Sequence, residues 1–240
     1  MPQRNRNSQR NLRNELTALR QMNEDEFDNP RMPLLLYSSS HMTRRRNFHS
    51  ALNTTWEEKY YSNPYFRFPE INAIPGRRLD ERFVSEFANK TEELDQQTAI
   101  LICLGDNNLS AFDTSKLRKG SKEVLRCAQM MLDVHSSSDH LLLFLGLLPR
   151  WSHTPKQFTW HQKTDQNLKE LVCENFEAPA GDRLGFESTS GWFMENNFLI
   201  RDWYERDGTH FNVGGTYRLA YNCLAASSRL VSNYHLAEYV

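Results

Sequence analysis

The sequence has few cysteines, and they lie far apart. Its 240 residues include only Cys103, Cys127, Cys173 and Cys223. No two of them form the Cys-x-x-Cys spacing that is typical of zinc sites and dithiol redox motifs. We therefore expect buried, reduced thiols of the kind found in cytosolic proteins.

The chain also has no long apolar run. The longest one, 141–148, ends at Pro149 and is far too short to span a bilayer. The first residues, MPQRNRNSQRNLRNEL, contain no apolar stretch of the kind that a signal peptide needs. We expect a soluble, cytoplasmic protein with no membrane span.

An excess of charge of one sign is absent as well. The chain has 29 Lys and Arg against 30 Asp and Glu, which gives a formal net charge of −1. The whole molecule is therefore not a polycation that coats nucleic acid. A nucleic-acid role would have to come from a local basic patch.

The first 31 residues differ from the rest of the chain. They interleave arginines with Asn, Gln and Ser and then turn acidic at NEDEFD. This pattern is typical of a solvated, partly disordered basic and polar tail, although an arm for RNA or for a partner protein is an alternative. We expect residues 32–240 to form a single domain, since this length suffices for one sizeable core.

Apolar runs alternate with amphipathic segments through this domain. The sequence predicts strands at 33–37, 65–74, 99–104, 141–148 and, as a short fifth strand, 198–200. It predicts helices at 44–58, 79–94, 115–134, 162–176 and 214–231. Strands that are apolar on every residue need cover on both faces, and strands that alternate with helices form parallel sheets. The expected fold is an α/β three-layer α/β/α sandwich with a flavodoxin-like parallel sheet, which binds ligands at the carboxyl ends of its strands.

Polar residues follow the first three predicted strands. Ser40 ends a triple serine before a helix, where backbone N–H groups favour a developing negative charge, although serines are also common in turns and as helix caps. Gly76 follows a proline in a turn that requires a positive φ and that lets a backbone N–H approach a ligand. The amide of Asn107 could donate into a cleft, as an oxyanion-hole group does, or simply form an Asx-turn.

The most specific motif is Asp207-Gly208-Thr209-His210, just before the last predicted helix. Here the carboxylate could hold one imidazole nitrogen and leave the other facing a nucleophile. An ordinary Asp-Gly turn with a capping His is the alternative. Together, the four segments supply a nucleophile, oxyanion donors, a base and a group that orients the base.

These segments resemble the four sequence blocks of the SGNH (GDSL-type) hydrolase superfamily, in the same order, from about residue 32 to the C-terminus. The family typically has Gly-Asp-Ser, Gly, Gly-x-Asn-Asp and Asp-x-x-His. This sequence has Ser38-Ser39-Ser40, Gly76, Gly105-Asp106-Asn107-Asn108 and Asp207-Gly208-Thr209-His210. The segment Leu147-Leu148-Pro149-Arg150 is also similar to SGNH-like domains of retroelement-derived proteins.

The resemblance implies a serine ester hydrolase that acts on a small ester through an acyl-enzyme, with no metal and no cofactor. Ser40, His210 and Asp207 would be the catalytic residues, and Gly76 and Asn107 would form the oxyanion hole with the Ser40 N–H. The sequence departs from the family at Ser38-Ser39, in place of Gly-Asp, and at Asn108, in place of Asp.

Five arginines indicate a rival function. Arg44, Arg45, Arg46, Arg77 and Arg78 follow the first two strands, either as a solvated basic stretch or as an RNA- or phosphate-binding rim. The OSK domain of the germ-plasm protein Oskar is an SGNH-like domain that lacks a working triad and binds RNA, so a catalytically inactive, RNA-binding domain is the alternative. A scaffold with no chemistry is a third possibility. We favour the hydrolase because Ser, Asp and His all stand at the triad positions; the sequence does not fix the oligomeric state.

Overall fold

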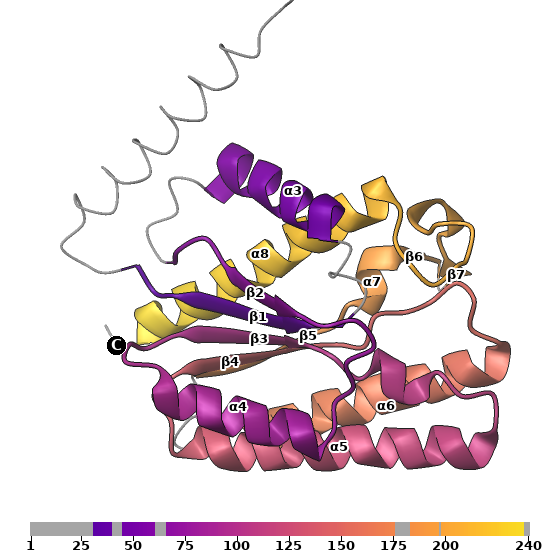
Figure 1. Ribbon diagram of the computed structural model, residues 1–240, viewed down its shortest axis with the longest axis horizontal. Coiled ribbons are helices and arrows are strands. Elements are labelled where there is room, and N and C mark those ends of the chain that lie inside the picture. The colour runs from indigo at the N-terminus through magenta and orange to yellow at the C-terminus, as the bar shows by residue number, and fades with distance from the viewer. Residues whose placement is uncertain (1–30, 40–44, 61–65, 176–182, 197, 238–240) are drawn as a thin grey trace, which may run out of the picture. The chain divides into compact units, whose positions relative to one another are not determined.

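The computed structural model describes residues 31–39, 45–60, 66–175, 183–196 and 198–237 (Figure 1). Contacts divide the chain into two units, Met1–Arg31 and Met32–Val240, and the description below concerns the second. Residues 1–30 of the N-terminal tail lie outside the described residues, so the expected disorder of the tail stays a prediction.

The centre of the domain is a sheet of five parallel strands in the order β2-β1-β3-β4-β5. Their bounds are Leu34–Ser38 for β1, Glu70–Ala73 for β2, Ala99–Cys103 for β3, Leu141–Leu145 for β4 and Leu184–Glu187 for β5. This is the flavodoxin-like order, with its switch point between β1 and β3. Ser38 pairs with both Ala73 and Cys103, so the first three strands end side by side.

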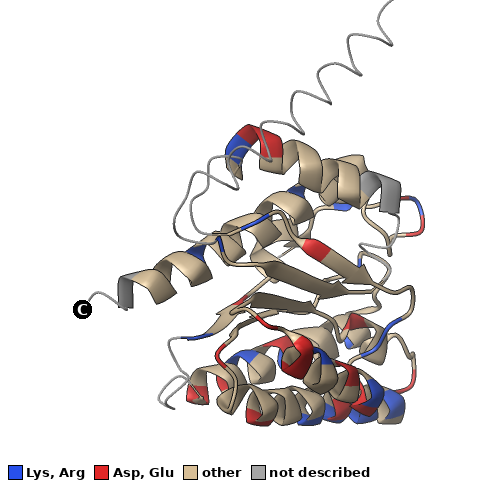
Figure 2. Ribbon diagram, turned by 60° about the vertical axis from the view of Figure 1, so that its left-hand side comes forward, with Lys and Arg blue, Asp and Glu red and all other residues tan. Residues whose placement is uncertain are grey.

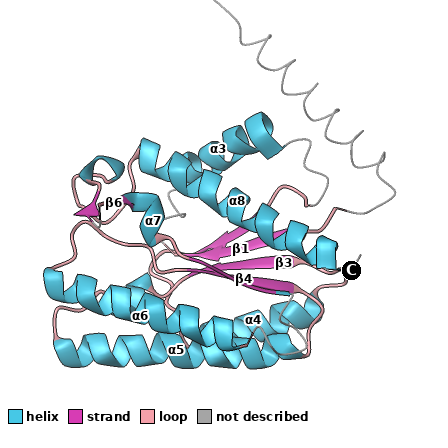
Figure 3. Cartoon of the chain, turned by 180° about the vertical axis from the view of Figure 1, so that it is seen from behind, coloured by secondary structure: helices cyan, strands magenta, loops and turns pink. Residues whose placement is uncertain are grey.

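Helices cover both faces of the sheet (Figure 1, and Figure 3 from behind). One layer contains α4 (Glu81–Glu93), α5 (Thr114–Ser136) and α6 (Pro155–Glu174); the other contains α3 (Arg45–Thr55) and α8 (Val213–Ala237). Alternate residues of β1 belong to different cores, because Leu34 and Leu36 pack toward α3 and α8 while Leu35 and Tyr37 pack toward α4 and α5. The predicted three-layer α/β/α sandwich is confirmed.

Two sequence-based predictions were wrong, one about a strand and one about the start of a helix. The predicted strand at 198–200 is not part of the main sheet, because β7 (Phe198–Leu199) pairs antiparallel with β6 (Met194–Glu195) in a separate two-stranded ribbon. The fifth strand of the main sheet is β5, which is short and contains a glycine. Helix α6 begins at Pro155, before the predicted 162, because Thr154 and Gln157 form a reciprocal capping box at its start.

The remaining elements are short. The π-helix η1 (Trp56–Tyr60) extends α3, and the 3₁₀ helix η2 (Asp106–Leu109) follows β3. Helix α7 (Ser190–Phe193) and the 3₁₀ helix η4 (Arg201–Trp203) lie between β5 and α8. Figure 2 shows charged residues of both signs interleaved along α4, α5 and α6 and a nearly uncharged sheet. Within the described ranges, no helix is both long enough and apolar enough to cross a membrane.

Candidate active site

The turn after β1 is buried. Ser38 and Ser39 have no exposed surface, and the Ser39 hydroxyl donates to Asp106 Oδ1 at 3.3 Å. This bond ties the end of β1 to η2, which follows the neighbouring strand β3. The next residue, Ser40, lies outside the described residues, so its assignment as nucleophile stays a prediction.

Gly76 lies in an exposed turn after β2. Its φ is +70°, a backbone conformation that glycine adopts without strain and that the Pro-Gly signal predicts. The turn is closed by a hydrogen bond from Arg77 N to Ile74 O at 3.2 Å. Among the described residues, the Gly76 N–H has no acceptor, so it can serve a ligand.

Asn107 lies next to this turn, and its amide is held at both ends. Its Nδ2 donates to the Arg77 carbonyl at 2.9 Å, and its Oδ1 accepts from Arg150 Nη2 at 2.6 Å. An amide nitrogen carries two hydrogens, and the second one has no acceptor within the described part of the chain. Asn107 and Gly76 therefore each retain one donor at the carboxyl end of the sheet.

Asn108, which stands in place of the family's Asp, is buried and has a structural role. Its Oδ1 accepts from Leu79 N at 3.0 Å, and its Nδ2 donates to Leu79 O at 2.9 Å and to Glu123 Oε2 at 2.9 Å. Because one side chain pairs with both backbone groups of Leu79, it fixes the segment after Gly76 to η2.

Sequence reasoning missed an ion pair at the carboxyl end of the sheet, between the segments that follow β3 and β4. Arg150 Nη2 donates to Asp106 Oδ2 at 2.5 Å, and the two side chains are only 11% and 2% exposed. The one available signal was a charged residue shortly after the buried run of β4, in the segment Leu147-Leu148-Pro149-Arg150.

Asp207 and His210 lie together in the loop before α8, as the motif predicts. Asp207 Oδ2 lies 2.7 Å from His210 Nδ1, and Asp207 Oδ1 accepts from the backbone N–H groups of Thr209 at 2.8 Å and His210 at 2.9 Å. Partial burial acts to raise the pKa of Asp207, but the bonds from the His210 ring and from these two N–H groups outweigh it and hold the pKa well below its ordinary value. An ionised carboxylate only accepts, so His210 Nδ1 carries a hydrogen and Nε2 is the basic nitrogen.

The loop of Asp207 and His210 is fixed to the segment that carries Arg150. Ser152 N donates to Gly208 O at 2.9 Å, and the Ser152 and Thr209 hydroxyls lie 2.9 Å apart. Gly208 has a φ of +65°, and a Cβ there would lie 3.0 Å from Ser152 N, so glycine suits this close approach. The segment 149–152 therefore links the Asp207–His210 loop to Asn107.

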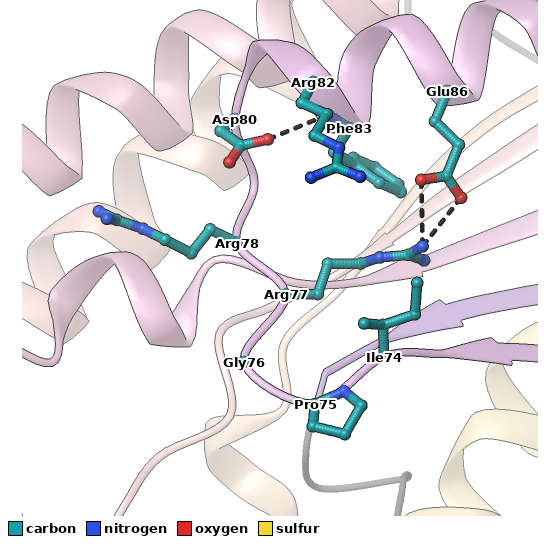
Figure 4. A pocket seen from close by; sticks show the side chains of 9 residues that line it. All are labelled: Ile74, Pro75, Gly76, Arg77, Arg78, Asp80, Arg82, Phe83 and Glu86. Atoms are coloured by element: carbon teal, nitrogen blue, oxygen red, sulfur yellow. Dashed lines mark hydrogen bonds and ion pairs between the residues drawn. The ribbon is translucent and has the colours of Figure 1, made fainter.

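The predicted arginine rim is described only in part. Arg44 lies outside the described residues, and so do the side chains of Arg45 and Arg46. The Arg77 side chain is 6% exposed and donates to both oxygens of Glu86, at 2.9 and 3.1 Å (Figure 4), and Arg78 pairs with Glu123 at 3.2 Å. Since both described arginines of the rim are engaged with carboxylates, the geometry does not favour the RNA-binding alternative.

A pocket of about 260 Å³ opens beside Gly76. Figure 4 shows it between the turn after β2 and the first turns of α4, with Ile74, Pro75 and Phe83 as its apolar wall. The exposed side chain of Arg82 and the Arg77–Glu86 ion pair also line the pocket. Of the candidate site residues, Gly76 lines this pocket, and Asn107, Asp207 and His210 do not.

Comparisons with known proteins place this geometry in a known fold. The sequence matches no family model and no curated protein. The structure is similar to the acetylxylan esterase Axe2 of Geobacillus stearothermophilus, with a TM-score of 0.58, 13% identity and coverage of 82% of this chain and 94% of that one. It is similar to the psychrotrophic esterase EstA of Pseudoalteromonas, solved as a monoethylphosphonate-inhibited form, with a TM-score of 0.53, 11% identity and coverage of 82% and 96%.

A GDSL-like lipase of Bacteroides thetaiotaomicron is similar too, with a TM-score of 0.52, 12% identity and coverage of 88% of this chain and 97% of that one. At such low identity the likeness concerns the fold. The domain has the SGNH (GDSL-type) hydrolase fold, as the four sequence blocks predict.

Proposed function

We propose that this protein is a serine ester hydrolase that works through an acyl-enzyme. The observation that carries the proposal is the Asp207–His210 pair: Oδ2 of the ionised carboxylate lies 2.7 Å from Nδ1 of the imidazole, accepts its hydrogen and leaves Nε2 as the basic nitrogen. It lies on an SGNH-type fold whose similar structures include esterases and a lipase.

In the first half-reaction, the Ser40 hydroxyl attacks the ester carbonyl carbon while His210 Nε2 takes its proton. The negative charge that develops on the carbonyl oxygen is stabilised by the Gly76 N–H and by the second hydrogen of Asn107 Nδ2. The tetrahedral intermediate then collapses, the alcohol leaves with the proton from His210, and the acyl group stays on Ser40.

In the second half-reaction, a water molecule gives its proton to His210 Nε2 and attacks the acyl carbon. Collapse of this intermediate releases the carboxylic acid and returns the proton to Ser40. Asp207 keeps its charge throughout and stabilises the imidazolium that forms twice in each cycle.

We expect a small ester as substrate, since the similar structures include an acetylxylan esterase and other esterases. The pocket of about 260 Å³ beside Gly76 is lined by none of Asn107, Asp207 and His210, so it would hold a part of the ester away from the reacting bond.

The test is labelling of the purified protein with a fluorophosphonate, together with turnover of p-nitrophenyl acetate. We expect both in the wild-type protein and neither in Ser40→Ala, whereas Ser85→Ala, which alters an exposed serine of α4, should behave like the wild type. Asn107→Ala should lower kcat by about 10²–10³, the usual effect of losing one oxyanion donor. A wild-type protein that is folded but neither labels nor turns over the ester would contradict the proposal, as would labelling that survives in Ser40→Ala.

A further inference from the structure

Arg150 has no part in the triad, and its guanidinium lies between two consecutive residues of η2. The two hydrogens of Nη2 go to Asp106 Oδ2 at 2.5 Å and to Asn107 Oδ1 at 2.6 Å. Arg150 is 9% exposed, and its buried Nε has no acceptor in the described part of the chain. A cation in such a place is costly unless it is paired, and Asp106 supplies the pairing charge.

The atoms around the Asn107 amide permit only one orientation of it. Arg150 has donors only, so the amide atom that faces it must be the oxygen. The Arg77 carbonyl only accepts, so the amide atom that faces it, at 2.9 Å, must be the nitrogen. With both ends fixed, the direction of the second Nδ2 hydrogen is fixed as well.

We propose that Arg150 is a positioning residue that sets the Asn107 amide in the orientation in which its second hydrogen meets the oxyanion. Its role in turnover rests on the proposed function. Asp106 has two roles in this arrangement. It neutralises Arg150, and it accepts a hydrogen bond from Ser39, which connects Arg150 to the turn after β1.

The chemistry of the two acceptors explains why an arginine stands here. A carboxylate and an amide oxygen on adjacent residues present two acceptors to one planar nitrogen, and a guanidinium holds both in a fixed geometry. Lysine keeps the charge but presents its donors from a flexible ammonium group. We therefore expect Arg150→Lys to retain part of the function and Arg150→Met, which has a similar stem and no donors, to lose it.

The kinetic test compares these variants on p-nitrophenyl acetate. Arg150→Met should lower kcat by at least about tenfold and leave KM within about twofold, because the amide acts on the transition state and hardly on the bound ester. The pH profile of kcat/KM should keep its shape. Arg183→Met is the matched control, since it removes an ion pair with Asp139 that lies before β4 and β5, at the opposite end of the sheet.

A double variant tests whether Arg150 acts through Asn107. If it does, Arg150→Met combined with Asn107→Ala should be no slower than Asn107→Ala alone, within about twofold. Losses that multiply would overturn the proposal, as would a kcat in Arg150→Met that equals the wild-type value.

A measurement that needs no activity separates this proposal from the proposed function. The side-chain amide signals of Asn107 in a ¹⁵N–¹H spectrum are identified by their loss in Asn107→Ala. Their hydrogen exchange should be about tenfold faster in Arg150→Met than in the wild type and unchanged in Arg183→Met. If the wild type has no esterase activity but this change occurs, the hydrolase proposal fails and the positioning of Asn107 stands. Unchanged exchange in Arg150→Met overturns the positioning role whatever the activity.

Discussion

Asn108 occupies the position at which the SGNH pattern has an aspartate, and its amide does what a carboxylate cannot. It accepts from Leu79 N and donates to Leu79 O, and its nitrogen also faces the Glu123 carboxylate at 2.9 Å. Asn108 is only 3% exposed. The asparagine that stands here in place of the aspartate of the SGNH pattern therefore fits the donors and acceptors around it.

We expect Asn108→Asp to destabilise the protein by about 1–3 kcal/mol at neutral pH. The change removes both donors, leaves the Leu79 carbonyl without its partner and places a second carboxylate against Glu123. Urea unfolding measures the loss. The control is Asn222→Asp: the Asn222 amide donates to the Arg218 carbonyl of its own helix, and its loss should cost less than about 0.5 kcal/mol. Equal stability of Asn108→Asp and the wild type would show that the amide is not needed there.

Among single residues, local sequence motifs predict some features of the candidate site and miss others. The turn at Gly76 and the Asp207–His210 contact can be predicted because each depends on residues within a few positions of one another. Asp106 and Arg150 are 44 positions apart in the sequence. Their pairing exists only because β3 and β4 are neighbours in the sheet, and nothing in either segment alone specifies it.

Among the elements, the contact of η2 with α5 depends on one glycine inside a helix. A Cβ on Gly120 would lie 2.0 Å from the Asn108 carbonyl oxygen, so only glycine allows η2 to rest directly on α5. Since η2 carries Asp106, Asn107 and Asn108, its contact with α5 helps to fix the position of Asn107, the candidate oxyanion donor.

We expect Gly120→Ala to destabilise the protein by about 1–3 kcal/mol and to lower ester turnover. Alanine usually stabilises a helix relative to glycine by about 1 kcal/mol, but here the clash with backbone must displace η2 or α5. The control is Gly191→Ala in α7, where a Cβ would meet nothing within 4 Å. Thermal unfolding and p-nitrophenyl acetate turnover check both variants, and a Gly120→Ala protein as stable as Gly191→Ala would refute the argument.

The sequence predicts the long elements of this fold better than the short ones. Strands β3 and β4 are apolar on every residue and β1 on every residue before Ser38, as strands covered on both faces usually are, so they are visible in the sequence. Strand β5 reads Leu-Gly-Phe-Glu, and only Leu184 in it is buried. The apolar segment at 198–200 looks more like a strand than β5 does, but its first two residues pair with β6 in a ribbon outside the main sheet.

For the molecule as a whole, we expect stability to depend on pH through the buried carboxyl of Asp165. Asp165 of α6 is 7% exposed and accepts from Leu147 N at 2.6 Å, which holds the segment between β4 and Arg150. Burial raises the pKa of Asp165 from its ordinary 3.8 to about 6, against the smaller opposing effects of the Leu147 N–H, the Ser188 hydroxyl and Lys169.

Because the folded state holds this proton more tightly than the unfolded state, Asp165 makes the protein more stable as the pH falls from about 6 toward 3.8. The same contribution is lost as the pH rises through 6. A shift of this size corresponds to at most about 3 kcal/mol. Asp207, with its lowered pKa, acts in the opposite direction, but only as the pH falls below its ordinary 3.8.

The difference between the wild type and Asp165→Asn isolates this effect, because the other titrating groups cancel. Asparagine keeps an oxygen for the Leu147 N–H and has no proton to bind. We expect the free energy of unfolding of the wild type, relative to Asp165→Asn, to stay nearly level well above the pKa of about 6 and to increase as the pH is lowered from there to about 4.5, as measured by urea unfolding at each pH. A difference that stays constant over this range would mean that Asp165 is ionised in the folded protein in spite of its burial, and that a cation or a water compensates its charge.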